Sequence, residues 1–132
     1  MNKLKGIISR IDKTDHIALI QVKVGEDHLS SVILSSGEDE PRVGEEVFIL
    51  FKETEVSIGK DLRGGLSMRN RLEAVIVSIE KGPVLSKIGL GYKGHTIFSV
   101  ITTSSAENLG LKPGDQVEGL IKSNEVTLMA VE

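Results

Sequence analysis

The feature that most constrains the fold is an internal repeat. The segment "NKLKGIISRIDK" that begins at Asn2 matches "NRLEAVIVSIEK" that begins at Asn70, at an offset of 68 positions (70 − 2). Further along, "VGEEVFILFKETEVSI" from Val43 matches "PGDQVEGLIKSNEVTL" from Pro113, at an offset of 70 (113 − 43). A fixed period of this kind indicates repeated structural units. The 132 residues are therefore expected to form two small units of the same fold.

Within each copy, apolar and polar residues alternate over short runs such as "HTIFSVIT", and turn residues such as Lys93-Gly94 separate the runs. Alternation with a period of two is typical of half-buried strands. Five short strands per copy predict an all-β fold, either a small barrel or a sandwich. We place the first unit at residues 1–60, a linker at 61–68 and the second unit at 69–132.

One short helix is predicted in the second copy, over "TSSAENLG". Ser104 is the expected N-cap, Glu107 its capping-box partner and Gly110 the C-terminal stop. The matching segment of the first copy, "SSGEDEPRVG", contains glycine, proline and three consecutive acids. We expect a looser and more acidic loop there.

Composition narrows the function classes. The chain is 39% hydrophobic and 27% charged, with a formal net charge of −3 and no cysteine. A mildly acidic chain with few aromatic residues is a poor candidate for nucleic-acid binding. The sequence has no apolar run near the roughly 18 residues that cross a bilayer and no signal-peptide pattern at its start. We therefore expect a cytoplasmic protein that does not insert into membranes.

The sequence gives little support to catalysis. The three histidines, His16, His28 and His95, fall near turns and have no spacing with a nucleophile or with other metal ligands. The glycine-rich stretch "IGKDLRGGLS" lacks the spacing of a phosphate-binding loop. We expect a protein that is not an enzyme, with no organic cofactor and no directly ligated metal cation.

A set of cations and hydroxyl groups lies at predicted strand edges and at the predicted helix start. Its members are Ser67, Arg69, Ser104, Ser105, Lys122 and Ser123. A desolvated dianion needs about two opposite charges and several donors, and amide groups at a helix start, here those of Ser105 and Ala106, add donors. Taken singly, each residue is more simply a solvated cation or a cap.

Three motifs decide between these interpretations: "SMRN", "TTSSAENLGLKPGD" and "IKSNEVTLMAVE". They resemble the Ser-x-Arg-Asn, Ser-Ala and Lys-Ser motifs of the molbindins, small molybdate-binding proteins built from Mop or TOBE-type domains. The resemblance covers both copies. It implies two tandem OB-like five-stranded barrels with one short helix in the second, assembly into a homotrimer, and oxyanion sites at domain interfaces.

The resemblance also assigns the ligand-binding residues. In the family, the Ser-x-Arg segment of one domain faces the Ser-Ala and Lys-Ser segments of another. The implied oxyanion-binding residues are Ser67, Arg69, Asn70, Thr103, Ser104, Ser105, Ala106, Lys122 and Ser123.

The first copy departs from this pattern. Only Met1 precedes Asn2, so the Ser-x-Arg pair is missing, and Glu53 follows Lys52 where the second copy has Ser123. A carboxylate repels a dianion. Lys52 remains a weaker candidate ligand, and fewer filled sites are expected than in a symmetric family member.

The leading hypothesis is therefore a cytoplasmic protein that binds molybdate or tungstate for storage, buffering or homeostasis. One alternative is a molybdate-sensing module that acts through a regulator or an ABC-transporter partner. A less favoured alternative is an OB-type oligonucleotide binder.

Overall fold

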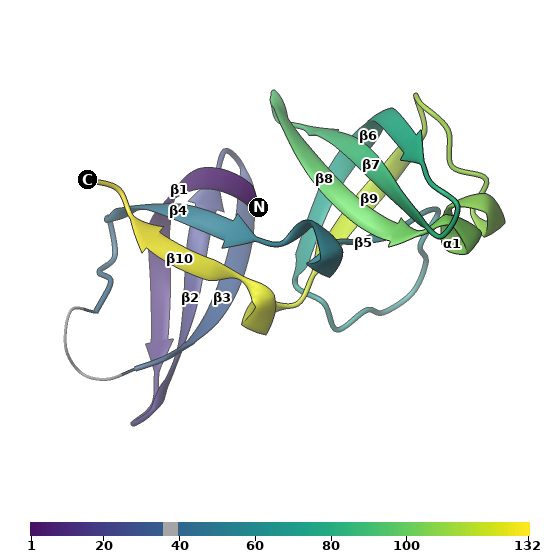
Figure 1. Ribbon diagram of the computed structural model, residues 1–132. Helices are drawn as coiled ribbons and strands as arrows, with labels where there is room; N and C mark the ends of the chain where they lie inside the picture. The colour runs from purple at the N-terminus through teal and green to yellow at the C-terminus, as the bar shows by residue number, and fades with distance from the viewer. Residues whose placement is uncertain (36–39) are drawn as a thin grey trace.

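The computed structural model describes residues 1–35 and 40–132 and contains two five-stranded, strongly curled sheets (Figure 1). The acidic loop expected in the first copy falls largely on residues 36–39, which lie outside the described residues. The elements are β1 (Asn2–Lys13), β2 (Ile17–Val24), β3 (Asp27–Leu34), β4 (Glu46–Phe51), η1 (Glu53–Glu55), β5 (Ser57–Gly59), β6 (Asn70–Lys81), β7 (Leu85–Tyr92), β8 (His95–Thr102), α1 (Thr103–Asn108), β9 (Gln116–Ile121), η2 (Ser123–Glu125) and β10 (Thr127–Ala130).

The repeat in the sequence is a repeat in structure. Strands β1 to β3 recur as β6 to β8, and β4 and η1 recur as β9 and η2. Even an irregularity is repeated, because the register of the first strand shifts between Ile8 and Arg10 and again between Ile76 and Ser78. A bulge of this kind bends a long strand. The predicted all-β fold with two five-stranded units and one short α-helix is confirmed.

The two sheets exchange their last strands. The first sheet has the order β10-β4-β1-β2-β3, and the second has the order β5-β9-β6-β7-β8. The C-terminal strand β10 therefore pairs with β4 of the first copy, while β5 leaves the first copy and pairs with β9. The sequence units 1–60 and 69–132 thus do not correspond to two independent sheets.

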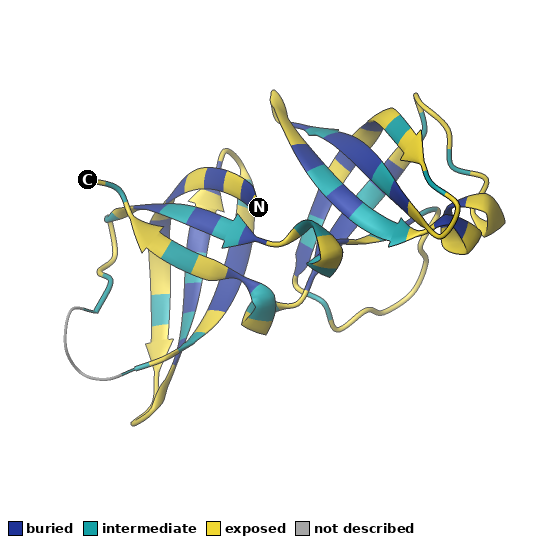
Figure 2. Cartoon of the chain, in the orientation of Figure 1, coloured by how far each residue is buried: buried dark blue, intermediate teal, exposed yellow. Residues whose placement is uncertain are grey.

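The core follows from the strand pattern. Buried and exposed residues alternate along the strands of both sheets, as Figure 2 shows, and β1 reads buried and exposed in turn over its first eight residues. Most of the buried apolar side chains form one cluster that draws on both copies. Val56 and Val126, which lie where the chain crosses between the sheets, belong to it. The two copies therefore share a continuous core.

The short helix α1 begins differently from the prediction. Its N-cap is Thr102 rather than Ser104: the Thr102 Oγ1 accepts from the Ser105 amide at 3.0 Å and donates to the Ser105 Oγ at 2.7 Å. Glu107 forms no capping box with Ser104 but pairs with Lys81 at 2.8 Å. All of Thr102, Thr103, Ser104 and Ser105 have side chains suited to capping, so composition alone could not choose among them.

The predicted stop at Gly110 is confirmed. Gly110 has φ of +60°, a left-handed conformation that glycine adopts without steric cost. Its amide donates to the carbonyl of Glu107, and the Leu111 amide donates to that of Ala106. These two bonds satisfy carbonyls at the helix end, as in a Schellman motif. No helix among the described residues is long and apolar enough to cross a membrane.

Candidate functional site

Part of the predicted site forms a small hollow beside the paired ends of β6 and β9. Asn70 opens β6 opposite Ile121, the last residue of β9, in antiparallel register. Residues just before Asn70 and just after Ile121 are therefore neighbours. The hollow, of about 270 Å³, is lined by Val32, Ser67, Met68, Arg69, Lys122, Ser123 and Asn124. Four of the predicted residues, Ser67, Arg69, Lys122 and Ser123, thus lie together within the second copy and the linker before it, whereas the resemblance placed the Ser-x-Arg and Lys-Ser segments on different domains.

The hollow carries uncompensated positive charge. Arg69 and Lys122 are exposed, and neither forms an ion pair within residues 1–35 and 40–132. A guanidinium, an ammonium and two hydroxyl groups around a small space are a donor set suited to a compact anion.

A nearby cation is paired instead. Arg71, two residues after Arg69, donates to both carboxylate oxygens of Glu118, at 2.6 and 2.8 Å. This contact raises the pKa of Arg71 and, mainly through the hydrogen bond, lowers that of Glu118. Arg71 is thus neutralised by Glu118, whereas Arg69 and Lys122, which line the hollow, have no such ion pair among the described residues.

Asn70, also predicted as a ligand, has another role. Its side chain is buried, with 1% of its surface exposed. The Oδ1 accepts from the amide of Ser30 at 2.6 Å, and the Nδ2 donates to the carbonyl of Ser30 at 2.9 Å. Both ends of the amide are therefore committed to the backbone of the first copy. Asn70 holds the two copies together beside the hollow and is not among the residues that line it.

The Ser-Ala segment lies elsewhere. Thr103 and Ala106 are buried, and the Thr103 hydroxyl is hydrogen-bonded to Ser86 at 2.8 Å and to the carbonyl of Gly82 at 2.7 Å. Ser104 and Ser105 are exposed, but the Ser105 amide, expected as an anion donor, already donates to Thr102.

Ser105 lines a separate hollow of about 380 Å³, together with Ser57, Ile58, Ile101, Asn108 and Leu109. This hollow shares no lining residue with the one at Arg69. Figure 1 shows α1 on the far side of the second sheet from the first copy. One chain therefore does not bring the Ser-Ala segment to Arg69 and Lys122.

The equivalent place in the first copy is occupied by a carboxylate and a ring. Glu53 stands where the second copy has Ser123, and its Oε1 lies 3.8 Å from the Nζ of Lys87. The same Nζ lies 4.5 Å from the centre of the Phe98 ring. Lys52 is exposed, but the neighbouring Glu53 makes this locus unfavourable for a dianion.

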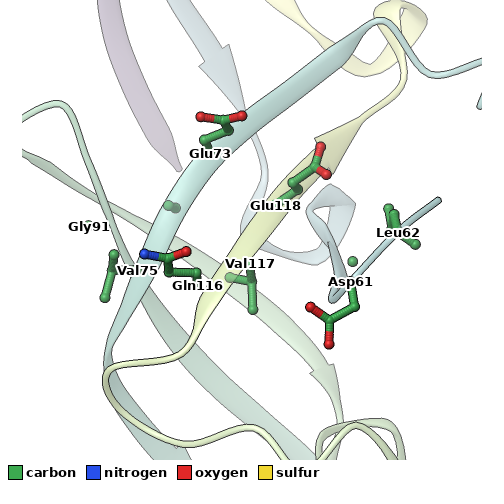
Figure 3. A pocket seen from close by; sticks show the side chains of 10 residues that line it. Asp61, Leu62, Glu73, Val75, Gly91, Gln116, Val117 and Glu118 are labelled. Carbon is green, nitrogen blue, oxygen red and sulfur yellow. The ribbon is translucent and has the colours of Figure 1, made fainter.

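A larger hollow has the wrong charge for an anion. It measures about 470 Å³, and Asp61, Glu73 and Glu118 are among the residues that line it (Figure 3). Among the described residues no group of three or more His, Cys, Asp or Glu side chains could hold a metal ion. The three histidines are exposed, as expected.

Sequence reasoning missed Val32, Met68 and Asn124 as lining residues and Ser30 as a neighbour. Met68 and Asn124 lie inside the motifs "SMRN" and "KSNEV" and could have been included with them. Val32 and Ser30 come from the other copy, and their place depends on the packing of β3 against η2. No local pattern indicates that contact.

The fold and site define a class: a protein of two repeated, curled β-sheets with a cationic, hydroxyl-lined hollow. Residues 66–128 match the TOBE domain. Molybdenum-pterin-binding protein 1 of Clostridium pasteurianum is 35% identical over 66 residues, which are 49% of this chain and 97% of that protein. A crystal structure of the cytoplasmic molybdate-binding protein ModG with molybdate bound superposes with a TM-score of 0.93 at 30% identity, covering 98% of this chain and 96% of that one. The chain belongs to the molbindin family of TOBE-domain proteins.

Longer relatives also match. The molybdenum-pterin-binding protein MopB of Rhodobacter capsulatus is 35% identical over 119 residues, 86% of this chain and 44% of that protein. The molybdenum transport protein ModE of Azotobacter vinelandii is 29% identical over 131 residues, 96% of this chain and 48% of that protein. The chain thus spans about half the length of these two relatives.

Proposed function

We propose that the chain binds molybdate, or its near-equivalent tungstate, in the hollow between Arg69 and Lys122. The observation that carries this proposal is the placement, beside the hydroxyl groups of Ser67 and Ser123, of two cations that form no ion pair within residues 1–35 and 40–132. The similarity to ModG, which binds molybdate, supports the same ligand.

The chemistry of the hollow favours a tetrahedral dianion. Two positive charges neutralise the two charges of the ligand, which offsets much of the cost of removing it from water. Hydroxyl and N–H donors around the hollow suit a ligand that has only acceptor oxygens. Molybdate and tungstate have nearly the same size and shape, whereas sulfate is smaller and would leave some of these donors without contact.

The role that follows is storage or buffering of the anion in the cytoplasm, without catalysis. The relatives MopB and ModG are named as binding proteins. The site offers donors for holding an anion, and no nucleophile and base are paired in it.

Assembly into a homotrimer is part of the proposal. The Ser-Ala segment and the hollow at Arg69 lie apart within one chain, so a second chain is needed to bring them together. Exposed apolar side chains on the first strands, including Ile7, Val75 and Val77, supply surface for such contacts. Analytical ultracentrifugation should give three times the chain mass of 14.3 kDa; a monomer at micromolar concentration would contradict this part.

Titration calorimetry with molybdate, tungstate and sulfate at constant ionic strength tests the function. We expect saturable heat with molybdate and tungstate, with similar affinities, and a dissociation constant for sulfate at least tenfold weaker. An absence of heat with both molybdate and tungstate would overturn the proposal.

A second candidate is a molybdate-sensing module that works through a larger partner. The observation in its favour is that nearly the whole chain matches part of longer proteins, among them the molybdenum import ATP-binding protein ModC of Brucella abortus, at 28% identity over 97% of this chain and 34% of that protein. A sensing module should associate with a partner only when molybdate is present, which affinity purification with and without the anion would reveal. A storage protein should show no such dependence.

A further inference from the structure

A hydroxyl group of the first copy reaches the candidate site of the second. The Oγ of Ser30, on β3, lies 2.7 Å from the Oγ of Ser123, the first residue of η2. Ser123 lines the hollow, whereas Ser30 does not and is 7% exposed. Ser30 therefore stands behind Ser123 as seen from the hollow.

The surroundings of the Ser30 hydroxyl limit how its proton can be shared. The Ser30 hydroxyl has one proton and two acceptors within reach: Ser123 Oγ at 2.7 Å and Asn70 Oδ1 at 3.4 Å. Asn70 Oδ1 already accepts from the Ser30 amide at 2.6 Å. The 2.7 Å contact is the stronger of the two, and either hydroxyl can donate in it; the arrangement that leaves Asn70 Oδ1 to the Ser30 amide has Ser30 donating to Ser123. In that arrangement the proton of Ser123 is free to point into the hollow.

We propose that Ser30 is a positioning residue of the oxyanion site, which directs the Ser123 hydroxyl toward a ligand held by Arg69 and Lys122. This inference rests on the proposed function. A hydroxyl that accepts one hydrogen bond becomes a better donor in the next. Both copies therefore build the site: Ser30 of the first copy orients the Ser123 hydroxyl of the second, which contacts the anion.

The repeat contains its own comparison. Phe98 of the second copy is equivalent to Ser30 of the first, and Glu53 of the first copy is equivalent to Ser123 of the second. A ring cannot donate to a carboxylate, and the Nζ of Lys87 lies near both groups instead. Of these two equivalent places, the one with the hydroxyl pair is the one beside Arg69 and Lys122.

Removing the Ser30 hydroxyl should leave the fold intact. The contacts that Asn70 makes across the copies go mainly to the amide and carbonyl of residue 30, and these remain in Ser30→Ala. The matched control is Ser99→Ala. Ser99 is buried, like Ser30, and its hydroxyl donates to the carbonyl of Val56 at 2.6 Å, but it is not among the residues that line the hollow.

The test is calorimetry with molybdate on the full chain and on Ser30→Ala, Ser30→Thr and Ser99→Ala, with the unfolding temperature of each ligand-free protein. We expect Ser30→Ala to bind molybdate about three- to tenfold more weakly, the range of one net hydrogen bond, with little change in unfolding temperature. Ser30→Thr, which keeps a hydroxyl, should restore affinity to within about twofold on the same reasoning. Ser99→Ala should unfold at a lower temperature and bind normally.

Two results would overturn the inference while the proposed function stands. The first is an affinity of Ser30→Ala for molybdate equal to that of the unchanged chain. The second is an equal loss of affinity in Ser99→Ala, because the loss would then follow from lower stability and not from the position of Ser30. A failure of the unchanged chain to bind molybdate would overturn the proposed function itself, and this inference with it.

Discussion

The side chain of Asn2 forms two hydrogen bonds with the backbone of Phe98, 96 residues away. Its Nδ2 donates to the Phe98 carbonyl and its Oδ1 accepts from the Phe98 amide, both at 2.8 Å. Asn70 and Ser30 repeat this arrangement in the opposite direction. Phe98 and Ser30 lie on β8 and β3, which are the edge strands of their sheets. Each asparagine thus satisfies backbone groups on an open edge of the other copy's sheet.

Asn70→Ala is expected to lower the free energy of unfolding by about 2–4 kcal/mol, because it leaves a buried N–H and a buried carbonyl without partners. Chemical denaturation monitored by circular dichroism measures the change. Asn108→Ala, at an exposed position near the end of α1, serves as the control and should cost less than about 1 kcal/mol. Equal effects of the two substitutions would show that the contact with Ser30 contributes little.

Because β10 pairs with β4, removal of the C-terminal strand should affect a strand of the first copy. Deletion of residues 127–132 removes β10, whose partner is β4 of the first copy. Amide hydrogen exchange should therefore accelerate in β4, at residues 46–51, more than in β9, which keeps β5 and β6. If β9 lost protection first, the pairing of β10 with the first sheet would be wrong.

Tyr92 predicts a loss of stability at alkaline pH. Burial, together with the 2.6 Å hydrogen bond from its hydroxyl to Asp27 and the charge of that carboxylate, raises the pKa of Tyr92. The unfolded chain ionises at a pKa of about 10. The contribution of this group is therefore complete below pH about 10 and is lost as the pH rises above that value toward the higher folded pKa.

Ultraviolet absorbance can follow this ionisation directly, since Tyr92 is the only tyrosine. The native chain should ionise at a higher pH than the chain in denaturant, and Tyr92→Phe should show a shallower alkaline fall in stability. If Tyr92 ionised at the same pH in the native chain and in denaturant, its buried hydrogen bond to Asp27 would be contradicted.

Ser123→Glu gives the second copy the residue type that the first copy has at the equivalent position, Glu53. A carboxylate in the hollow would neutralise one of its cations and repel the ligand, at a cost of several kcal/mol at the effective dielectric of a protein surface. Binding of molybdate should weaken at least a hundredfold. Ser123→Ala, which only removes a donor, should weaken it about tenfold or less. Full affinity for molybdate in Ser123→Glu would show that Ser123 is not part of the binding site.

Sequence patterning was sufficient for the fold of each copy, because alternation, turn residues and the repeat all indicate strands. It could not specify which sheet β5 and β10 join, since a strand of three or four residues fits either edge equally well. The motifs named Ser67, Arg69, Lys122 and Ser123, which line one hollow, but the resemblance placed the two segments on different domains, whereas both lie in the second copy and the linker before it. The motifs did not distinguish Asn70, whose amide faces the backbone of Ser30, from its neighbours that line the hollow.

The central claim is that the two cations of the hollow, Arg69 and Lys122, bind a molybdate dianion, and Arg69→Ala tests it most directly. Arg63→Ala is the matched control, because Arg63, like Arg69, is an exposed arginine between β5 and β6 but is not among the residues that line the hollow. Calorimetry should show molybdate affinity reduced at least tenfold by Arg69→Ala and unchanged by Arg63→Ala. Equal affinities in the unchanged chain and in Arg69→Ala would contradict the account.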